Sequence, residues 1–258
     1  MATSPETLRH PFAEPGTRAL VALAHPDDEY LIGSGIDAQV RNGVIVHAFV
    51  ATKGKASMRG DSLNQISISR GSRALEGRAA LSAYGISPRR QHIYDFPDGQ
   101  LLDTTPDVLA QEIRSLLAKN DITTVITLGE HGFDGHTDHV AVHEAARAAV
   151  AAHAEIQPGM RLFGLDLASP TTHIVADPGA KLRRLRHHRS QFDIDTTDPS
   201  YEPLGGTVEQ PGIQLSPDTR NRLAKYVLLQ EQEPYRLETF SSVYLQPSVP
   251  DLRELARV

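Results

Sequence analysis

The sequence of 258 residues contains no cysteine and no tryptophan, and aromatic residues make up only 5% of it. Without cysteine the chain cannot build a disulfide scaffold, a thiolate zinc site, an iron–sulfur cluster or a thiol nucleophile. Any metal site must therefore consist of imidazole and carboxylate groups. The chain has 12 histidines and 32 acidic residues that can supply them.

The sequence also lacks a strong charge and a long apolar run. Lys and Arg number 26 against 32 Asp and Glu, which gives a formal net charge of −6. This weakly acidic balance offers no electrostatic footprint for nucleic acid or an anionic membrane, so we expect neither as a partner. The polar start Met1–Glu6 does not resemble a signal peptide. We expect a cytoplasmic protein, and homo-oligomerisation stays open.

Short apolar runs alternate with helical patterns along the chain. Strands are predicted at 18–24, 44–51, 91–95, 122–128, 160–167, 172–176 and 237–245, and helices at 64–84, 106–119, 138–153, 180–191 and 218–229. This alternation indicates a single Rossmann-like α/β domain over residues 18–258, with a mostly parallel sheet flanked by helices. Residues 1–17 are predicted to be an irregular N-terminal segment, and 193–217 a long loop or lid.

Ligand-capable side chains follow the first predicted strand without a gap, in the segment His25-Pro26-Asp27-Asp28-Glu29. In open α/β sheets, ligands bind at the carboxyl ends of strands. His25 and Asp28 are three residues apart around a Pro-restricted turn, so both can face one ion while Asp27 points into the space above it. The alternative is a polar loop with an Asp helix cap. A cap explains one aspartate but not the whole cluster.

A second cluster follows the strand predicted at 122–128, where four of the 12 histidines fall within 13 residues. Histidine is the commonest metal ligand and a proton shuttle near neutral pH. For His136 and His139 we predict a functional role. For His131 and His143 we predict exposed positions at a solvated helix start.

Together these residues resemble the PIG-L/LmbE-like zinc-dependent N-deacetylases. That family includes the deacetylases of GlcNAc-phosphatidylinositol and the deacetylases and amidases of mycothiol and bacillithiol metabolism. The strings that carry the resemblance are Ala24-His25-Pro26-Asp27-Asp28-Glu29 and His136-Thr137-Asp138-His139. Looser matches are Arg73-Ala74-Leu75-Glu76, Phe96-Pro97-Asp98-Gly99, and Lys181 with His188-Arg189-Ser190-Gln191. The resemblance covers roughly residues 18–191.

The resemblance implies one zinc ion per chain, bound by His25, Asp28 and His139, with another divalent metal as the alternative. It implies Asp27 as the general base and His136, in its protonated form, as general acid or oxyanion stabiliser. The chemistry is consistent, because three N/O ligands leave a fourth position open, as in catalytic zinc sites. Zinc also lowers the pKa of bound water to about 7.

Three more residues are candidate site residues. Arg73 and Asp98 match positions that contact the sugar; the alternatives are a surface-helix arginine and a turn aspartate. Asp138 is predicted either to orient a histidine ring or to cap a helix. In some family members a tyrosine precedes the second motif, whereas this chain has Phe133-Asp134-Gly135. Either Tyr30 or Tyr94 replaces that tyrosine, or oxyanion stabilisation rests on zinc and His136.

A run of basic residues lies near the end of the resemblance, at Lys181, Arg183, Arg184, Arg186 and Arg189. An anion site is one interpretation. We predict a solvated helix face instead, since charge runs are commonly exposed. His188 and Gln191 are further candidate site residues.

The sequence therefore predicts a zinc-dependent hydrolase that cleaves an amide in a small N-acylated substrate. The first hypothesis is N-deacetylation of an N-acetylglucosamine-type amino sugar or its conjugate. The second is an amidase acting on a larger thiol-sugar conjugate or an acylated natural product. A non-catalytic sugar- or nucleotide-binding module is the alternative from another class. No GxxxxGK[ST] motif supports nucleotide binding.

Overall fold

The computed structural model describes residues 6–8, 12–56, 72–103, 106–166, 170–188 and 232–238. Their strands form one sheet in the order β1-β7-β8-β6-β5-β2-β3-β4. Strand β8 is antiparallel to β6 and β7, and the other neighbouring strands are parallel. The strands are β1 Glu6–Leu8, β2 Arg18–Leu23, β3 Ile45–Val50, β4 Gln91–Ile93, β5 Thr124–Leu128, β6 Arg161–Leu165, β7 Thr172–Val175 and β8 Gln232–Leu237. The predicted mostly parallel sheet is confirmed.

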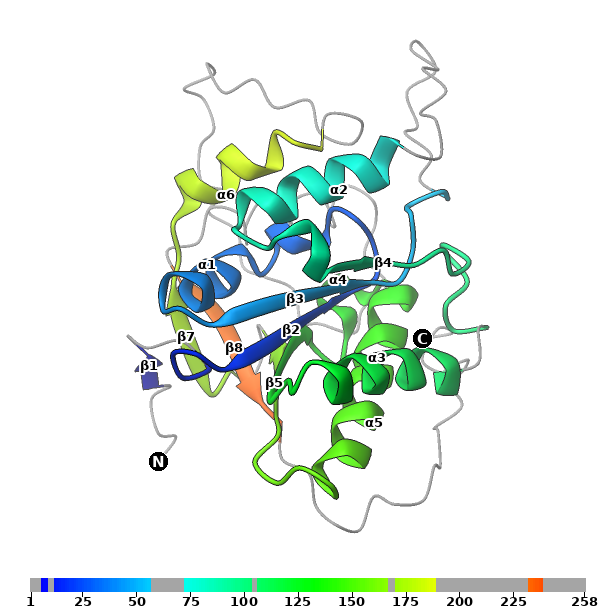
Figure 1. Cartoon of the computed structure of the whole chain (residues 1–258). Helices are drawn as coiled ribbons and strands as arrows, with labels where there is room; N and C mark the ends of the chain where they lie inside the picture. Colours follow the sequence, from blue (N-terminus) through cyan, green and yellow to red (C-terminus); the bar gives the residue numbers. More distant parts are fainter. Residues whose placement is uncertain are drawn as a thin grey trace.

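Helices cover both faces of the sheet, so that the fold has three layers (Figure 1). Helices α2 and α6 lie above the sheet in this view, and α3 and α5 lie below it. The helices are α1 Gly33–Arg41, α2 Ser72–Ala83, α3 Pro106–Lys119, α4 Gly132–Gly135, α5 Thr137–Ala154 and α6 Pro178–Leu185, with 3₁₀ turns η1 Asp28–Tyr30 and η2 Pro88–Arg90.

Strand β2 shows why the sheet is covered on both sides. Ala19, Val21 and Leu23 pack into one hydrophobic cluster with residues of α1 and α2. Leu20 and Ala22 point the other way, into a second cluster with residues of α3 and α5. Because side chains alternate along a strand, a strand buried on both faces has the continuous apolar run seen in the sequence.

The strand order places the ends of β2 and β5 side by side. From β2 the chain continues to β3 and β4 on one side, and β5 then returns to the other side of β2. Such a reversal is a topological switch point, where open α/β sheets bind their ligands. Both clusters of ligand-capable residues follow strands that meet here.

Two boundaries of the sheet differ from the sequence-based expectation. Residues 1–17 are not irregular throughout, because Glu6–Leu8 pairs in parallel with β7 as β1. The last strand begins at Gln232, earlier than the predicted 237. Glu233 and Pro234 disfavour a strand by local propensity, and the contacts of Glu233 within the fold override it. Residues 193–217 and 218–229 lie outside the described residues.

Helix α1 was not predicted from the sequence. Its first turn contains Gly33 and Gly35, which have poor helix propensity. A Cβ atom at either glycine would clash with a tyrosine hydroxyl, that of Tyr84 or of Tyr235. The glycines are therefore required by close packing, which local propensity does not reveal.

The sequence suggested that the basic residues of α6 form a solvated helix face, but some of them are buried. Lys181 is fully buried, with its Nζ 2.5 Å from Glu233, which is also buried. Arg184 makes two bonds to Asp37, of 2.5 and 2.6 Å. Arg183 and Arg186 are exposed as predicted. Lys181 and Arg184 differ from the exposed arginines because they contact residues far away in the sequence. The local sequence pattern does not reveal such contacts.

We expect Lys181→Met to lower the free energy of unfolding by about 3 kcal/mol, because it leaves the Glu233 carboxylate buried without its cation. Glu233 keeps the amides of Ser34 and Gly35 as donors, which places the loss at the low end of the range for broken buried pairs. Urea unfolding measures the loss. Arg183→Met, on the exposed face of the same helix, is the control. Equal stability of both variants would contradict the prediction.

Strand β3 carries a buried histidine, His47, whose ring stacks parallel to that of His92 on β4 with centroids 5.9 Å apart. Burial, together with the nearby charges of His92, Arg90 and Arg18, lowers the pKa of His47 to about 4. Folded His47 therefore stays neutral at pH values where an unfolded histidine, with a pKa of about 6.5, takes up a proton.

We expect this difference to destabilise the fold as the pH drops from about 6.5 to 4, because the unfolded state then binds one more proton. The lowered pKa corresponds to a loss on the order of 2–3 kcal/mol. In urea titrations, His47→Gln should lose less stability than the wild type between pH 7 and pH 4. Parallel pH profiles for the two proteins would show that His47 is not responsible.

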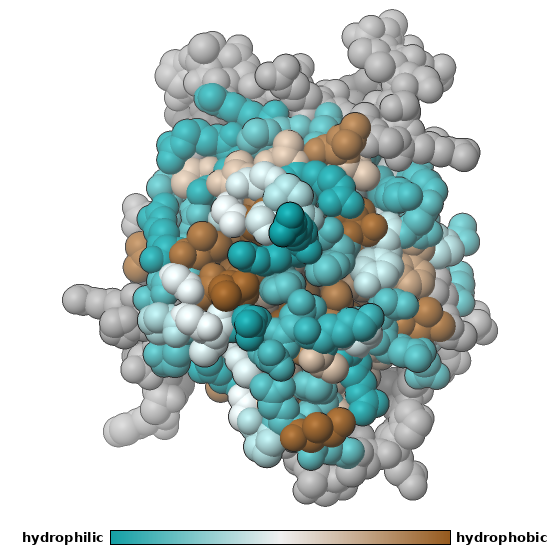
Figure 2. Space-filling view, in the orientation of Figure 1, coloured by the Kyte–Doolittle hydropathy of each residue, from teal (hydrophilic) through white to brown (hydrophobic). Residues whose placement is uncertain are grey.

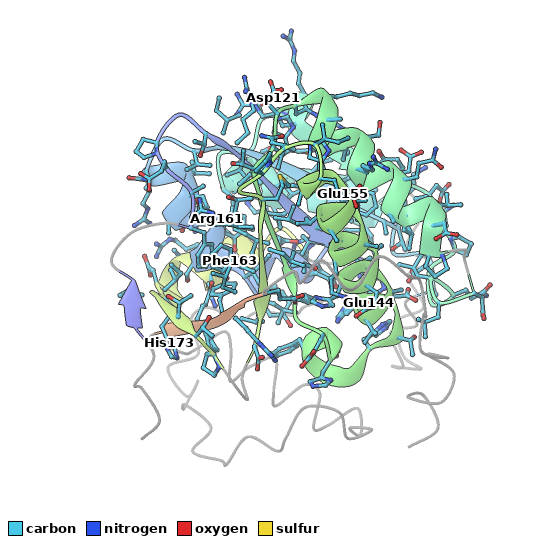
Figure 3. The ribbon with its side chains drawn as sticks, turned by 90° about the horizontal axis from the view of Figure 1, so that it is seen from below. Asp121, Glu144, Glu155, Arg161, Phe163 and His173 are labelled. Carbon is cyan, nitrogen blue, oxygen red and sulfur yellow. The ribbon has the colours of Figure 1, made fainter. Side chains whose placement is uncertain are left out.

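The surface is mostly hydrophilic in the view of Figure 2, with separate small apolar areas. The large apolar side chains exposed among the described residues come from different parts of the fold: Leu75, Val108, Ile156, Val175 and Leu237. On the side seen in Figure 3, Glu144 lies on α5 and Glu155 directly follows the last residue of this helix. None of the helices that the structure describes combines the length and apolarity required to cross a membrane.

Candidate metal centre

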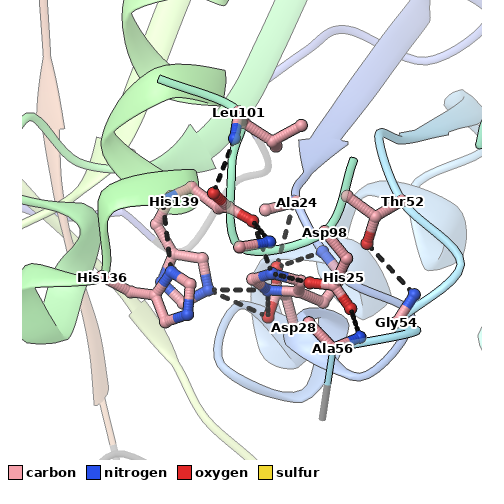
Figure 4. A network of polar contacts seen from close by, with 12 residues as sticks. Ala24, His25, Asp28, Thr52, Gly54, Ala56, Asp98, Leu101, His136 and His139 are labelled. Atoms are coloured by element: carbon pink, nitrogen blue, oxygen red, sulfur yellow. Dashed lines mark hydrogen bonds and ion pairs between the residues drawn. The ribbon is translucent and has the colours of Figure 1, made fainter. Parts of the chain in front are cut away.

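Three donor atoms converge where the loops after β2 and β5 meet (Figure 4). His25 Nδ1 lies 3.2 Å from His139 Nε2 and 3.5 Å from Asp28 Oδ1, and His139 Nε2 lies 3.2 Å from Asp28 Oδ1. All three side chains are buried. The structure thus brings together the three residues to which the sequence assigned a metal ion.

The other ring nitrogen of each histidine is held by an oxygen. His25 Nε2 lies 3.2 Å from both Asp138 Oδ2 and Asp98 Oδ1. His139 Nδ1 donates to the carbonyl of Gly132 at 2.9 Å. These contacts place the ring proton on the outer nitrogen and leave the inner nitrogen's lone pair for an ion, an arrangement typical of metal-bound histidines.

The two oxygens of the Asp28 carboxylate also have different partners. Its Oδ2 accepts the backbone N–H groups of Ala24 at 3.0 Å and His25 at 2.7 Å, and Oδ1 faces the two histidines. Donors about 2.1 Å from a tetrahedral zinc ion lie about 3.4 Å apart. The observed separations of 3.2–3.5 Å therefore fit zinc without rearrangement.

The loop before α5 is shaped to deliver His139. Gly132 and Phe133 have left-handed φ values of 62° and 65°. Glycine adopts this region freely, whereas phenylalanine adopts it at an energetic cost of about 1–3 kcal/mol. The resulting turn aims the Gly132 carbonyl at His139, so the strained residue lies directly beside the candidate metal ligands.

Asp138 is fully buried and orients a histidine ring. Besides its contact with His25, it accepts the backbone N–H of Gly99 at 2.7 Å and of Leu101 at 3.0 Å. It does not cap α5, because the N-cap is His136, whose Nδ1 accepts the Asp138 N–H at 3.2 Å. The helix-capping alternative for Asp138 is therefore wrong.

Asp27 and Arg73 form an ion pair at the same site. Arg73 Nη2 lies 2.6 Å from Asp27 Oδ1, and Nη1 donates to the Gly54 carbonyl at 2.9 Å. Gly77 allows α2 to approach this closely, since a Cβ there would lie 2.8 Å from the Pro26 carbonyl oxygen. Arg73 is buried, so the alternative of a surface-helix arginine is wrong.

Asp98 also points into the site, where both carboxylate oxygens have partners. Oδ1 faces His25 Nε2, and Oδ2 accepts the backbone N–H of Ala56 at 2.6 Å. The turn 97–99 that the sequence indicated is thus connected to a candidate metal ligand. Contact of Asp98 or Arg73 with a sugar stays a prediction.

Carboxylates control the charge on the two ligand histidines. Burial opposes protonation of His139, but Asp28 and Asp134 outweigh it and raise its pKa to about 10. The pKa of His25 is raised in the same way by Asp28, Asp138 and Asp98, against the effect of burial. A metal ion must therefore displace protons from these rings, and its affinity will fall in acid.

His136 has the opposite electrostatics. Burial and the neighbouring rings of His139 and His25 lower its pKa to about 4. It is therefore neutral at pH 7, in contrast to the protonated form expected from the resemblance. Because Nδ1 accepts the Asp138 N–H, the ring proton resides on Nε2.

The positions of the other histidines agree only in part with the sequence-based expectation. His143 was predicted to be exposed but is fully buried, with Nε2 3.1 Å from Glu238 Oε1. His188 is also buried, with Nε2 2.5 Å from Glu29. His131 is exposed as expected. The helical spacing of four residues between His139 and His143 does not distinguish a surface position from a buried one beside Glu238.

Asp134 contacts two histidines of the candidate metal centre, and it was not among the site residues predicted from the sequence. Asp134 Oδ1 accepts the backbone N–H of His136 at 3.0 Å and lies 3.3 Å from His139 Nδ1. Its position inside the histidine-rich segment was its only signal in the sequence.

Of the two tyrosines considered as replacements for the family's tyrosine, Tyr94 packs on Phe49 and its hydroxyl hydrogen-bonds with Glu112. Tyr30 is buried close to Asp27 and Asp134.

Fold and site together define an α/β protein whose candidate metal centre, two histidines and an aspartate, lies at the switch point of a parallel sheet. The family model described as PIG-L, GlcNAc-PI de-N-acetylase, matches residues 20–150. The chain belongs to the PIG-L family, and the resemblance seen in the sequence is confirmed.

The chain is 30% identical over 143 residues to a probable N-acetylglucosaminyl-phosphatidylinositol de-N-acetylase of Schizosaccharomyces pombe, covering 54% of each protein. It spans about half the length of the curated relatives it matches. N,N'-diacetylchitobiose deacetylase from Pyrococcus horikoshii shares the fold, with a TM-score of 0.62 and 16% identity over 90% of this chain and 88% of that one. So does a 4-carboxy-2-hydroxymuconate hydratase from Pseudomonas putida, with a TM-score of 0.58 and 12% identity over 87% and 97%.

Proposed function

We propose that this chain is a zinc-dependent N-deacetylase that acts on an N-acetylglucosamine-type amino sugar or its conjugate. The observation that carries the proposal is the convergence of His25, Asp28 and His139 beside Asp27 and His136. The family description and the names of relatives support the amide bond and the amino sugar as the target. The fold alone does not, because a hydratase shares it.

A zinc ion held by the three ligands would polarise the amide carbonyl and acidify a water molecule. The remaining chemistry belongs to the side chains around it. Asp27 Oδ1 is engaged by Arg73, and we assign Oδ2 as the atom that removes the proton from the attacking water. The guanidinium keeps the Asp27 carboxylate oriented while it acts. The same carboxyl group can then return the proton to the departing amine.

His136 is assigned to the oxyanion. As a neutral ring with its proton on Nε2, it can donate a hydrogen bond to the carbonyl oxygen as negative charge develops there. The backbone N–H of Asp138 fixes this tautomer and prevents the ring from turning its acceptor nitrogen toward the oxygen. Tyr30, close to Asp27 and Asp134, is the remaining candidate for the family's tyrosine.

The proposal is tested by measuring amine release from a panel of N-acetylated compounds with the zinc-loaded protein. The panel contains N-acetylglucosaminyl-phosphatidylinositol, N,N'-diacetylchitobiose, N-acetylglucosamine and an N-acylated natural product. We expect release from at least one amino sugar and loss of release after chelation, with recovery on adding zinc. Zinc binding without cleavage of any amino sugar would overturn the proposal and favour the amidase or binding-module alternatives.

A further inference from the structure

Helix α6 and the residues just after it present basic side chains to acidic residues around η1 and α1. Lys181 pairs with Glu233, which accepts the N–H groups at the start of α1. Arg184 pairs with Asp37 inside α1. His188 reaches furthest and pairs with Glu29, the last residue of the His25–Glu29 segment.

The His188–Glu29 pair is buried and short. Both side chains are 1% exposed, and Nε2 of His188 lies 2.5 Å from Oε1 of Glu29. The other oxygen of Glu29, Oε2, is buried without a hydrogen bond to any residue within the described ranges. A polar pair this deep is costly to bury, and neither residue has a part in the proposed chemistry.

The pair is connected to the site through a single turn. Glu29 lies in η1 with Asp28, and Asp27 is the residue that precedes this turn. A 3₁₀ helix has about three residues per turn, so successive side chains leave it about 120° apart. Fixing the direction of Glu29 therefore fixes the rotation of the turn about its own axis, and with it the direction of Asp28 and the orientation of the peptide that joins Asp27 to the turn.

The two aspartates depend on this turn to different extents. Asp28 is held independently, because its Oδ2 accepts the N–H groups of Ala24 and His25. The Asp27 carboxylate is instead held by the Arg73 guanidinium, which comes from a different element, α2. Rotation of η1 would thus displace Asp27 more than Asp28.

We propose that the His188–Glu29 pair positions the carboxylate of Asp27 for proton transfer, by locking the rotation of η1. The inference rests on the proposed deacetylase function. It assigns a role to two residues that bind neither the metal ion nor the substrate. The effect is local. His188 lies just after α6, its partner Glu29 lies in η1, and the contact between them affects the position of Asp27 directly before η1.

The test measures kcat, KM and zinc content for His188→Ala, Glu29→Ala and the double variant. We expect each single variant to lower kcat about 10–100-fold, the size of effect seen when groups that orient a metal site are removed. KM should stay within about twofold, and zinc should stay near one per chain because Asp28 keeps its own partners. The double variant should be no slower than either single variant, because both remove the same contact.

A conservative double variant guards against loss of folding. Glu29→Gln combined with His188→Gln replaces the pair with two uncharged amides that can still hydrogen-bond, and we expect kcat within about fivefold of wild type. Arg183→Gln, on the exposed face of α6, is the control and should behave as wild type.

The outcomes separate the two proposals. If the wild type releases amine but His188→Ala keeps its kcat, loses zinc, or adds its effect to that of Glu29→Ala, the positioning role is wrong. The positioning role is also wrong if the double variant Glu29→Gln/His188→Gln has a kcat as low as that of His188→Ala. If the wild type cleaves none of the amino sugars, the proposed function itself fails.

Discussion

Asp27→Asn is expected to lower deacetylase turnover about 10³–10⁴-fold while leaving the zinc content unchanged. The amide cannot accept the proton of the attacking water, and general bases contribute effects up to this size. The fold should tolerate the change, because an asparagine oxygen can still accept from the Arg73 guanidinium that bonds Asp27 Oδ1. The measurement is kcat on the best substrate of the panel, with metal analysis of the same preparation.

The control for this variant is Asp121→Asn. Asp121 is exposed, pairs with Arg18 at the opposite end of the sheet and has a left-handed φ of 48°, which asparagine also accepts. It should keep wild-type turnover. If Asp27→Asn retained more than about a tenth of the activity, Asp27 could not be the general base.

His139→Ala is expected to weaken zinc binding about 10²–10³-fold and to abolish turnover at micromolar zinc. Apparent zinc affinities of about 10–16 kcal/mol for four-ligand sites correspond to about 2.5–4 kcal/mol per ligand. Loss of His139 also removes a cationic neighbour from Asp28 and from Asp134, since both carboxylates lie 3.2–3.3 Å from its ring. Competition with a chromophoric chelator measures the affinity.

His131→Ala provides the matched comparison, because His131 belongs to the same loop but is exposed. Its zinc affinity should equal that of the wild type. Tight zinc binding by His139→Ala would exclude His139 as a ligand. In that case the second group of close donors, His25, His136 and Asp138, would become the candidate site.

The candidate metal ligands could be predicted because two short strings carry the family resemblance that assigns them. His25 and Asp28 follow β2 directly and His139 follows β5, so a mostly parallel sheet led us to expect the two segments to meet. Strands β2, β5 and β6 were found because each is mainly a run of buried apolar residues, whereas β1 was missed and β8 was placed too late. Helix α3 was found to the residue, since Pro106 begins it and its buried positions are helically spaced.

What the sequence could not show depends on contacts between distant residues. Lys181 and Arg183 occupy the same helix, and only the position of Glu233 on β8 makes one buried and the other exposed. The same holds for His143, which is covered near Glu238. Arg73 was assigned to the sugar, but its ion pair with Asp27 crosses 46 positions of sequence that carry no pattern.

The switch point between β2 and β5 has a further consequence for folding. An ion bound by both His25 and His139 would tie together residues 114 positions apart. In a chain without cysteine, it would act as a removable cross-link that closes a very long loop. Closing a loop of about 100 residues with a disulfide restricts the unfolded chain by about 4–5 kcal/mol in the chain-entropy picture. The same ion that serves the chemistry would thus fasten the first third of the chain to its middle.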